Sequence, residues 1–180
     1  MAKMRHFLIL LVALLFSACA TTTPPPPQPI KISDDELKLV LIKSKNIRFY
    51  DFGTLSVGAD SSDSMRIELR VFKLGKFLGS FVVTKSEICY TDFDKIDDCA
   101  PKWVAARSFF GNVSYGELFE DIFQKNDIFD GQGKRVGIDD TIIQEFSYGG
   151  EKIYYEHSQK RIYFKNLSNG VIVSIEDYVK

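Results

Sequence analysis

The sequence predicts an α+β fold in which two mid-chain helices cover the concave face of a curved antiparallel sheet. Apolar and polar residues alternate with period two in the first half of the chain and again near its end, which is typical of half-buried strands. Short joins rich in Gly, Asn and Ser connect these stretches and indicate local antiparallel hairpins. Between them, apolar residues recur at helical spacing, and a helix with one apolar stripe must cover a sheet face.

Residues 1–18 have the pattern of an export signal. Lys3 and Arg5 precede FLILLVALLF, an apolar run of about ten residues, which is shorter than the roughly 20 that span a bilayer. Two small residues and Cys19 follow, and cleavage before a cysteine resembles the lipobox of bacterial lipoproteins, although Phe16 stands where leucine is usual. The resemblance implies that Cys19 carries lipid such as palmitate and anchors the chain durably in a membrane. An ordinary signal peptide followed by a chance cysteine is the alternative.

Residues 19–32 are predicted to be a tether. The stretch ATTTPPPPQPI favours an extended polyproline II spacer of about 3.1 Å per residue, so the tether spans roughly 30 Å. Ala20 follows the cysteine in place of aspartate, which by resemblance to lipoprotein sorting signals implies the outer membrane, with the domain facing the periplasm. Residues 33–180 then have the length of a single globular domain.

The first half of this domain is predicted to consist mainly of strands. The acidic stretch SDDE precedes LKLVLIKS, a segment whose pattern fits either a helix or a strand. Alternation then predicts strands over 47–57, 65–71, 77–84 and 87–90, with the turn ADSSD between the first two.

Cys89 and Cys99 flank the polar segment YTDFDKIDD, which is predicted to be a loop. The export signal implies an oxidising compartment, so we expect a Cys89–Cys99 disulfide that closes this loop. A ring of this size contributes about 3 kcal/mol in the chain-entropy account. The two thiols lack a nearby histidine for zinc and lack the C-x-x-C spacing of a redox motif.

Two helices are predicted after Cys99. Pro101 suits the first turn of a helix that continues through KWVAARSFF. Ser114 and Glu117 form an S-x-x-E capping box for the second helix, and Val113 can pack on Leu118 as a hydrophobic staple.

The end of the chain is predicted to be a four-stranded meander. Strands are expected over 141–148, 152–157, 161–166 and 171–179. Gly-Gly, Ser-Gln and Ser-Asn-Gly joins connect them.

Composition argues against several functional classes. Without residues 1–18 the chain has 21 basic and 24 acidic residues, a net charge of −3, which gives no indication of nucleic acid binding. The 15 Phe and 8 Tyr residues indicate either a large dry core or an apolar cavity.

Catalytic chemistry has little support. His157 is the one histidine after the signal peptide, and a single histidine on a strand is more often structural than catalytic. The chain has no nucleophile elbow, no HExxH motif and no P-loop. The acidic cluster within residues 92–98 lacks the spacing of a calcium loop. We therefore expect no enzymatic activity, no cofactor and no metal.

Two segments resemble the LolB family of outer-membrane lipoproteins. VSYGELFEDIF resembles that family's second inserted helix, and GVIVSIEDYVK is similar to its last strand, with Asp177 and Tyr178 at the acidic and aromatic ending. The resemblance implies an incomplete β-barrel of the LolA/LolB type, with mid-chain helices over an apolar cavity for acyl chains. It also implies a monomer that takes part in lipoprotein localisation and receives cargo from a periplasmic LolA-like carrier, or chaperone.

Under this resemblance, inward aromatic and aliphatic residues are the cavity candidates. They are Phe49, Leu55, Ile67, Leu69, Phe81, Trp103, Phe110, Leu118, Ile122 and Phe146. VFKLGKFLG resembles the family's membrane-contact loop, with Leu74-Gly75 as the matching pair and Leu78-Gly79 as a second register. Alternatively, Leu74 and Phe77 simply pack under the turn.

A second hypothesis is a structural or interaction lipoprotein of the envelope, such as a scaffold or a surface antigen. It predicts a filled core and an exposed apolar patch for a partner. The chain also resembles small lipoproteins of epsilonproteobacterial type, which bring no activity with them.

Overall fold

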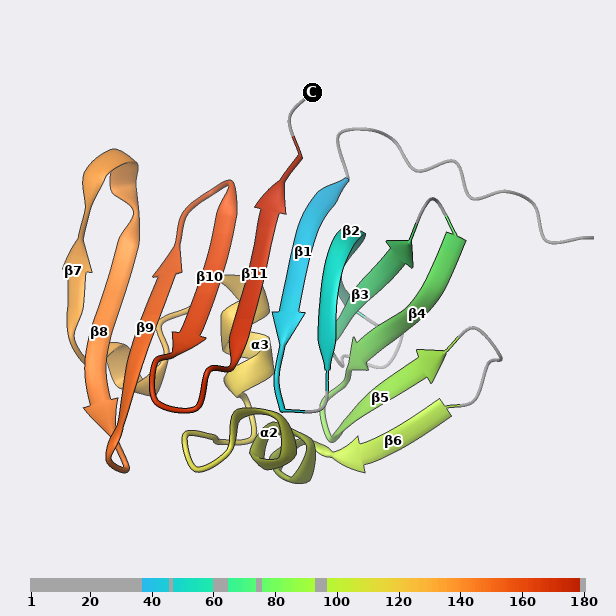
Figure 1. Cartoon of the computed structure of the whole chain (residues 1–180), viewed down its shortest axis with the longest axis horizontal. Coiled ribbons are helices and arrows are strands. Elements are labelled where there is room, and N and C mark those ends of the chain that lie inside the picture. The colour runs from blue at the N-terminus through green and yellow to red at the C-terminus, as the bar shows by residue number, and fades with distance from the viewer. Residues whose placement is uncertain (1–36, 46, 60–64, 74–75, 93–96, 179–180) are drawn as a thin grey trace, which may run out of the picture. The chain divides into compact units, whose positions relative to one another are not determined.

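Eleven described strands form one antiparallel sheet in the computed structural model of the chain (Figure 1). Their order is β6-β5-β4-β3-β2-β1-β11-β10-β9-β8-β7. The structure describes residues 37–45, 47–59, 65–73, 76–92 and 97–178, all within one compact unit. The predicted signal peptide, Cys19 and the tether lie outside these residues, as do Leu74 and the side chain of Phe77.

Two meanders make up the sheet. The first contains β1 (Lys38–Lys43), β2 (Arg48–Ala59), β3 (Met65–Lys73), β4 (Lys76–Val83), β5 (Glu87–Asp92) and β6 (Asp97–Pro101). The second contains β7 (Lys134–Val136), β8 (Ile142–Tyr148), β9 (Glu151–His157), β10 (Arg161–Asn166) and β11 (Ile172–Asp177). β1 pairs with both β2 and β11, so it joins the meanders and leaves β6 and β7 at the two edges. The predicted antiparallel sheet with two mid-chain helices is confirmed.

The ambiguous segment at the start of the domain is a strand. Val40 and Ile42 are buried, while Leu39 and Leu41, which alternate with them, lie half-buried on the opposite face. A strand that is partly covered on both faces has apolar residues at successive positions. This is why LKLVLIKS shows no clean alternation.

Two edge strands were missed by the pattern because they carry mostly polar residues. β6 lies within and just after the segment expected to be a loop, and it pairs with β5 so that Cys89 faces Cys99 directly. The expected Cys89–Cys99 disulfide is present, with an S–S distance of 2.04 Å. β7 at the other edge is exposed at all of its positions. Short, charged edge strands of this kind protect a sheet from pairing with other chains.

Both helices lie on the same face of the sheet, behind it in the view of Figure 1, and we call this face the inner face. They are α2 (Lys102–Phe110) and α3 (Leu118–Gln124), and the short 3₁₀ helices η2 (Phe129–Gly131) and η3 (Ile138–Asp140) follow. The predicted capping box is wrong. α3 begins at Leu118 with Glu117 as its N-cap and has no side-chain cap among the described residues.

Tyr115 explains where α3 begins. Its hydroxyl donates a hydrogen bond of 2.6 Å to the Asp121 carboxylate, and its ring packs edge-on against Phe129. These two contacts hold the turn before α3 against the helix and against η2. Val113 and Leu118, the predicted staple pair, are both fully buried.

Aromatic residues from both helices fill the core against the inner face. The Phe110 ring lies 4.7 Å from the Phe119 ring and 5.1 Å from the Phe164 ring of β10. Aromatic pairs in such tilted and edge-on arrangements stabilise a core beyond their buried area.

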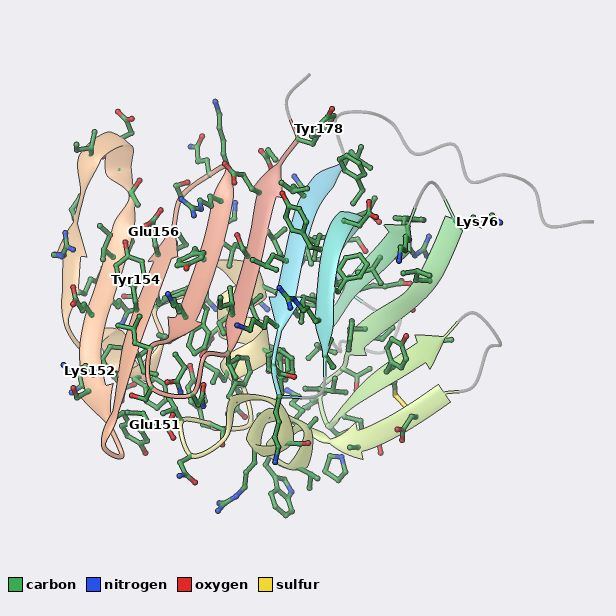
Figure 2. The ribbon with its side chains drawn as sticks, viewed as in Figure 1. Lys76, Glu151, Lys152, Tyr154, Glu156 and Tyr178 are labelled. Atoms are coloured by element: carbon green, nitrogen blue, oxygen red, sulfur yellow. A yellow bond between two sulfur atoms is a disulfide. The ribbon has the colours of Figure 1, made fainter. Side chains whose placement is uncertain are left out.

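The opposite, outer face is polar over the second meander, as the side chains labelled on β9 show (Figure 2). The Tyr154 hydroxyl donates a 2.6 Å hydrogen bond to the Glu156 carboxylate. This hydrogen bond is the main reason that the pKa of Tyr154 is raised to about 12.

Replacing Cys89 and Cys99 together by serine is expected to lower the free energy of unfolding by about 2–3 kcal/mol, because the unfolded chain regains the freedom of a short ring. Urea unfolding of both proteins measures this loss. Reducing agent should lower the stability of the native protein by a similar amount and leave the variant unchanged. Equal stability of the two oxidised proteins would contradict the expectation.

Candidate functional site

An apolar hollow lies on the inner face at the end of β1 where Ile42 meets the turn into β2. It has a volume of about 420 Å³ and is lined by Ile42, Ile47, Phe49, Val71, Leu78, Phe81, Tyr90 and Asp98. An adjoining space of about 260 Å³ shares Ile47, Phe81, Tyr90 and Asp98 with it and extends to α2. We call these two spaces together the α2 hollow. Either volume is within or near the range of small-molecule pockets.

The strands place these residues by alternation and by one irregularity. Phe49 of β2 and Phe81 of β4 lie on the inner face, where both pack partly buried against the core. The register of β3 and β4 shifts between Val71 and Phe72, so Leu78 has no partner in the register and reaches the α2 hollow beside Val71. A bulge of this kind re-aims a side chain.

Gly79 allows Tyr90 to lie over β4. A Cβ at Gly79 would be 2.6 Å from the Thr91 carbonyl oxygen and 2.9 Å from the Tyr90 hydroxyl, which real side chains do not allow. The Tyr90 ring packs 4.9 Å from the Phe81 ring and remains 37% exposed. The hollow therefore has an aromatic wall that solvent reaches.

The structure separates the predicted cavity residues into three groups. Phe49 and Phe81 line the α2 hollow, and Leu55 lines a different hollow at the opposite end of β1. Five are completely buried and form core, namely Ile67, Leu69, Phe110, Leu118 and Ile122, and Phe146 is 9% exposed on β8. Leu69 also borders a gap of only about 10 Å³.

Trp103 does not face inward as predicted. It is 65% exposed on the outside of α2, because the buried positions of that helix are Lys102, Ala106 and Phe110. These positions follow the four-residue spacing of one helix face. Lys102 faces the sheet, whereas Trp103 was predicted to point inward.

A buried ion pair explains the position of Lys102. Its Nζ lies 2.6 Å from the Glu120 carboxylate of α3, with the two side chains only 10% and 8% exposed. The first residue of α2 is thereby joined to α3. The helix that borders the α2 hollow is fixed at this end by a charge pair.

The hollow also contains residues that the sequence analysis missed, namely Ile42, Ile47, Val71, Leu78, Tyr90 and Phe109. Alternation within strands could have found Ile42 and Val71. Ile47 lies just before β2 and follows the alternation that begins there, on the same face as Phe49, whereas Leu78 lies at the bulge and does not follow it.

His157 lies on β9 beside Tyr155, with their ring centroids 5.1 Å apart. Its Nε2 is buried and has no hydrogen-bond partner within the described part of the chain. Burial lowers the pKa of His157, while Asp127 acts in the opposite direction. The environment favours a neutral imidazole.

Comparison of the sequence with protein-family models and with curated proteins found no match. Among the described residues, no helix has the length and apolar character needed to span a membrane.

Replacing Lys102 by methionine is expected to lower the free energy of unfolding by about 3–5 kcal/mol, because the Glu120 carboxylate remains buried without a partner. Urea unfolding measures this. The double variant Lys102→Met/Glu120→Leu should recover most of the loss, and a double variant as unstable as the single one would contradict the explanation. Lys134→Met, which breaks the exposed Lys134–Asp127 pair, is the control and should cost at most about 1 kcal/mol.

Stability is expected to fall as the pH is lowered through the ordinary histidine pKa of 6.5. The folded protein has the lower pKa at His157, so the unfolded chain takes up the proton first and is favoured in that range. Urea unfolding at pH 7.5 and pH 5.5 should show a smaller pH effect in His157→Gln than in the native protein. An equal pH effect in both would show that another group is responsible.

Proposed function

We propose that this protein is a LolB-like lipoprotein, anchored in the outer membrane through Cys19, that binds acyl chains in the α2 hollow. In this proposal it takes part in lipoprotein localisation and receives its cargo from a periplasmic LolA-like carrier. It acts without catalysis and without a cofactor. The single observation that carries the proposal is the α2 hollow itself, whose larger space of about 420 Å³ is lined mainly by apolar residues on the inner face and is reached by solvent.

The chemistry of the lining supports an acyl chain as the ligand. In the larger of its two spaces, six residues are aliphatic or phenylalanine and Tyr90 adds an aromatic ring, while Asp98 is the single charged residue of that lining. Each 100 Å² of apolar surface that a chain buries there contributes about 2.5 kcal/mol. Affinity for a long chain therefore requires no specific polar recognition.

The sheet provides a second support. An open antiparallel sheet whose mid-chain helices lie on one face is the arrangement that a LolB-like resemblance implies. The disulfide between β5 and β6 also suits a protein that folds in an oxidising compartment.

A scaffold or surface antigen of the envelope is the second candidate, and one observation favours it. Trp103 is 65% exposed and Val104 37% exposed on α2, which gives an apolar patch at the surface. A protein partner that binds this patch would require no ligand in the α2 hollow.

Phe49→Glu is expected to weaken binding of a neutral acyl probe, the methyl ester of pyrenedecanoic acid, by at least about tenfold, because it places a charge in the apolar lining. The full chain carrying Cys19→Ala, which lacks the predicted lipid acceptor, is titrated with the probe and pyrene fluorescence is followed.

Tyr50→Glu is the matched control. Tyr50 is the next residue of β2, points to the outer face and is 65% exposed, so the same charge there should leave binding unchanged. Absence of probe binding by the native lining would overturn the lipid-binding proposal and favour the scaffold. Equal loss in both variants would show that the probe binds elsewhere.

A further inference from the structure

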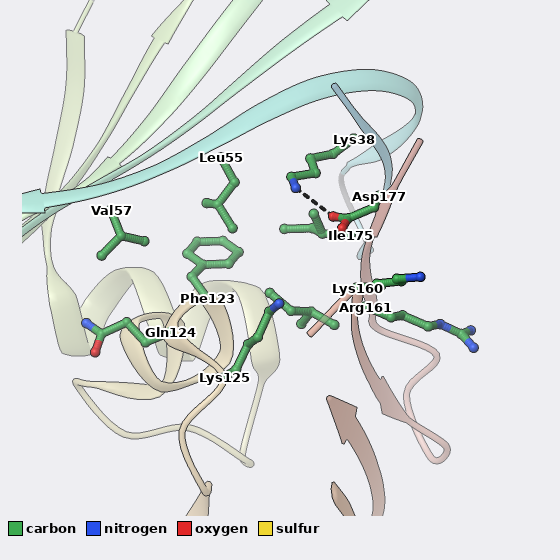
Figure 3. A pocket seen from close by; sticks show the side chains of 11 residues that line it. Lys38, Leu55, Val57, Phe123, Gln124, Lys125, Lys160, Arg161, Ile175 and Asp177 are labelled. Atoms are coloured by element: carbon green, nitrogen blue, oxygen red, sulfur yellow. Dashed lines mark hydrogen bonds and ion pairs between the residues drawn. The ribbon is translucent and has the colours of Figure 1, made fainter. Parts of the chain in front are cut away.

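A second hollow, of about 450 Å³, lies at the opposite end of the inner face, where β1 begins and β11 ends (Figure 3). We call it the basic pocket, because Lys38, Lys125, Lys160 and Arg161 line it together with the single acidic residue Asp177. These residues contribute a charge of +3 to one hollow of a chain whose formal net charge is −1. The pocket therefore concentrates positive charge that the molecule as a whole does not have.

Two of these lysines face the interior of the pocket. Figure 3 shows the side chains of Lys38 and Lys125 directed into the same space, whereas Lys160 and Arg161 extend outward along its rim. Arg161 also forms an ion pair with Glu156, with 3.5 Å between the Arg161 Nη1 and the Glu156 Oε1. The ammonium groups of Lys38 and Lys125 are thus the ones that a molecule in the pocket would meet.

The fold positions both lysines. Lys38 is the first residue of β1 and lies opposite Asp177 of β11, with its Nζ 2.6 Å from that carboxylate. Lys125 ends α3 in the left-handed conformation, with φ of 62°, and its Nζ donates to the Gln159 carbonyl oxygen. Burial is the main reason that the pKa of Lys125 is lowered, Lys38 acts in the same direction, and Asp177 acts in the opposite direction.

Part of the pocket wall is apolar. Leu55, Val57, Phe123 and Ile175 line this part, and Figure 3 shows Leu55 and Phe123 beside the space that Lys38 and Lys125 enter. Val57 is 53% exposed although it lies on the inner face. The pocket thus combines an exposed apolar wall with two ammonium groups.

We propose that the basic pocket binds an amphiphile with an anionic head group, which contacts Lys38 and Lys125 while its apolar part lies along Leu55, Val57 and Phe123. This inference goes beyond the proposed function, because it assigns a second binding site that is separate from the α2 hollow. The occupant follows from charge complementarity with the two lysines and from the apolar wall beside them. A free inorganic anion would use only the lysines, and a neutral lipid only the apolar wall.

The test compares pyrenedecanoic acid with its methyl ester, two probes with one chain and different head charges. The full chain carrying Cys19→Ala should bind the acid about tenfold more tightly than the ester, since charge-assisted contacts to a partly buried ammonium are strong. Lys125→Gln should remove this preference without changing ester binding. Lys152→Gln, which removes an exposed charge on the outer face of β9, is the matched control and should retain it.

A second variant is expected to strengthen the preference for the acid, whereas Lys125→Gln removes it. Asp177→Asn removes the only acidic group of the pocket lining and should increase the preference for the acid several-fold. Inorganic phosphate at millimolar concentration should compete weakly, and only with the acid.

The outcomes separate the two proposals. Binding of neither probe overturns the proposed function together with this inference. Equal binding of both probes, or a preference for the acid that Lys125→Gln leaves intact, overturns the inference and leaves acyl binding standing. Full displacement of the acid by phosphate alone would show that the pocket binds small anions, and would overturn the proposal that it binds an amphiphile.

Discussion

The pairing of β1 with β11 is the constraint on which the rest of the structure depends. Because β1 also pairs with β2, the two meanders become one sheet, and β6 and β7 are placed at opposite edges. The segment between them, residues 102–133, must therefore cross the inner face from one edge to the other. Eleven strands at about 4.8 Å spacing give a sheet roughly 48 Å wide, whereas helices of nine and seven residues extend about 24 Å together. The crossing helices cover the middle of the face, and the α2 hollow and the basic pocket lie where their cover ends.

Polar contacts hold the crossing segment together and attach it to the second meander. Within the segment, Lys102 of α2 is paired with Glu120 of α3. From the turn between β10 and β11, the Asn169 side chain donates a 3.1 Å hydrogen bond to the Phe110 carbonyl oxygen. Beyond α3, fully buried Gln144 of β8 accepts from the Ile128 N–H and donates to the Ile128 carbonyl oxygen. Buried polar groups satisfied in this way specify one arrangement more sharply than apolar packing does. The helices therefore have defined positions although they cover the face incompletely.

Most of the sheet could be predicted from the sequence because period-two alternation is a local signal. The last four strands match the expected ranges closely for that reason. β6 and β7 could not be predicted, because an edge strand buries little apolar surface and its polar residues have the composition of a loop. The inward position of Lys102, and with it the exposure of Trp103, depends on Glu120, whose role no local pattern reveals. Of the α2 hollow, alternation identified Phe49 and Phe81, but Leu78 depends on a bulge. The basic pocket was beyond prediction, because Lys38, Lys125 and Lys160 are brought together only by the long-range pairing of β1 with β11.

The two hollows differ in chemistry, and a layer of apolar side chains separates them. The narrow gap of about 10 Å³ has Phe81 and Ile42 in common with the α2 hollow and Phe123 in common with the basic pocket. A space of that size holds about one water molecule, so the hollows are separate in this structure. Their separation depends on aromatic side chains of α3 packed against strand residues, because Phe119 and Phe123 border the gap together with Leu69 and Val173. The length of chain that either hollow can accept is therefore limited by the packing of α3, the same short helix whose last turn places Lys125 at the basic pocket.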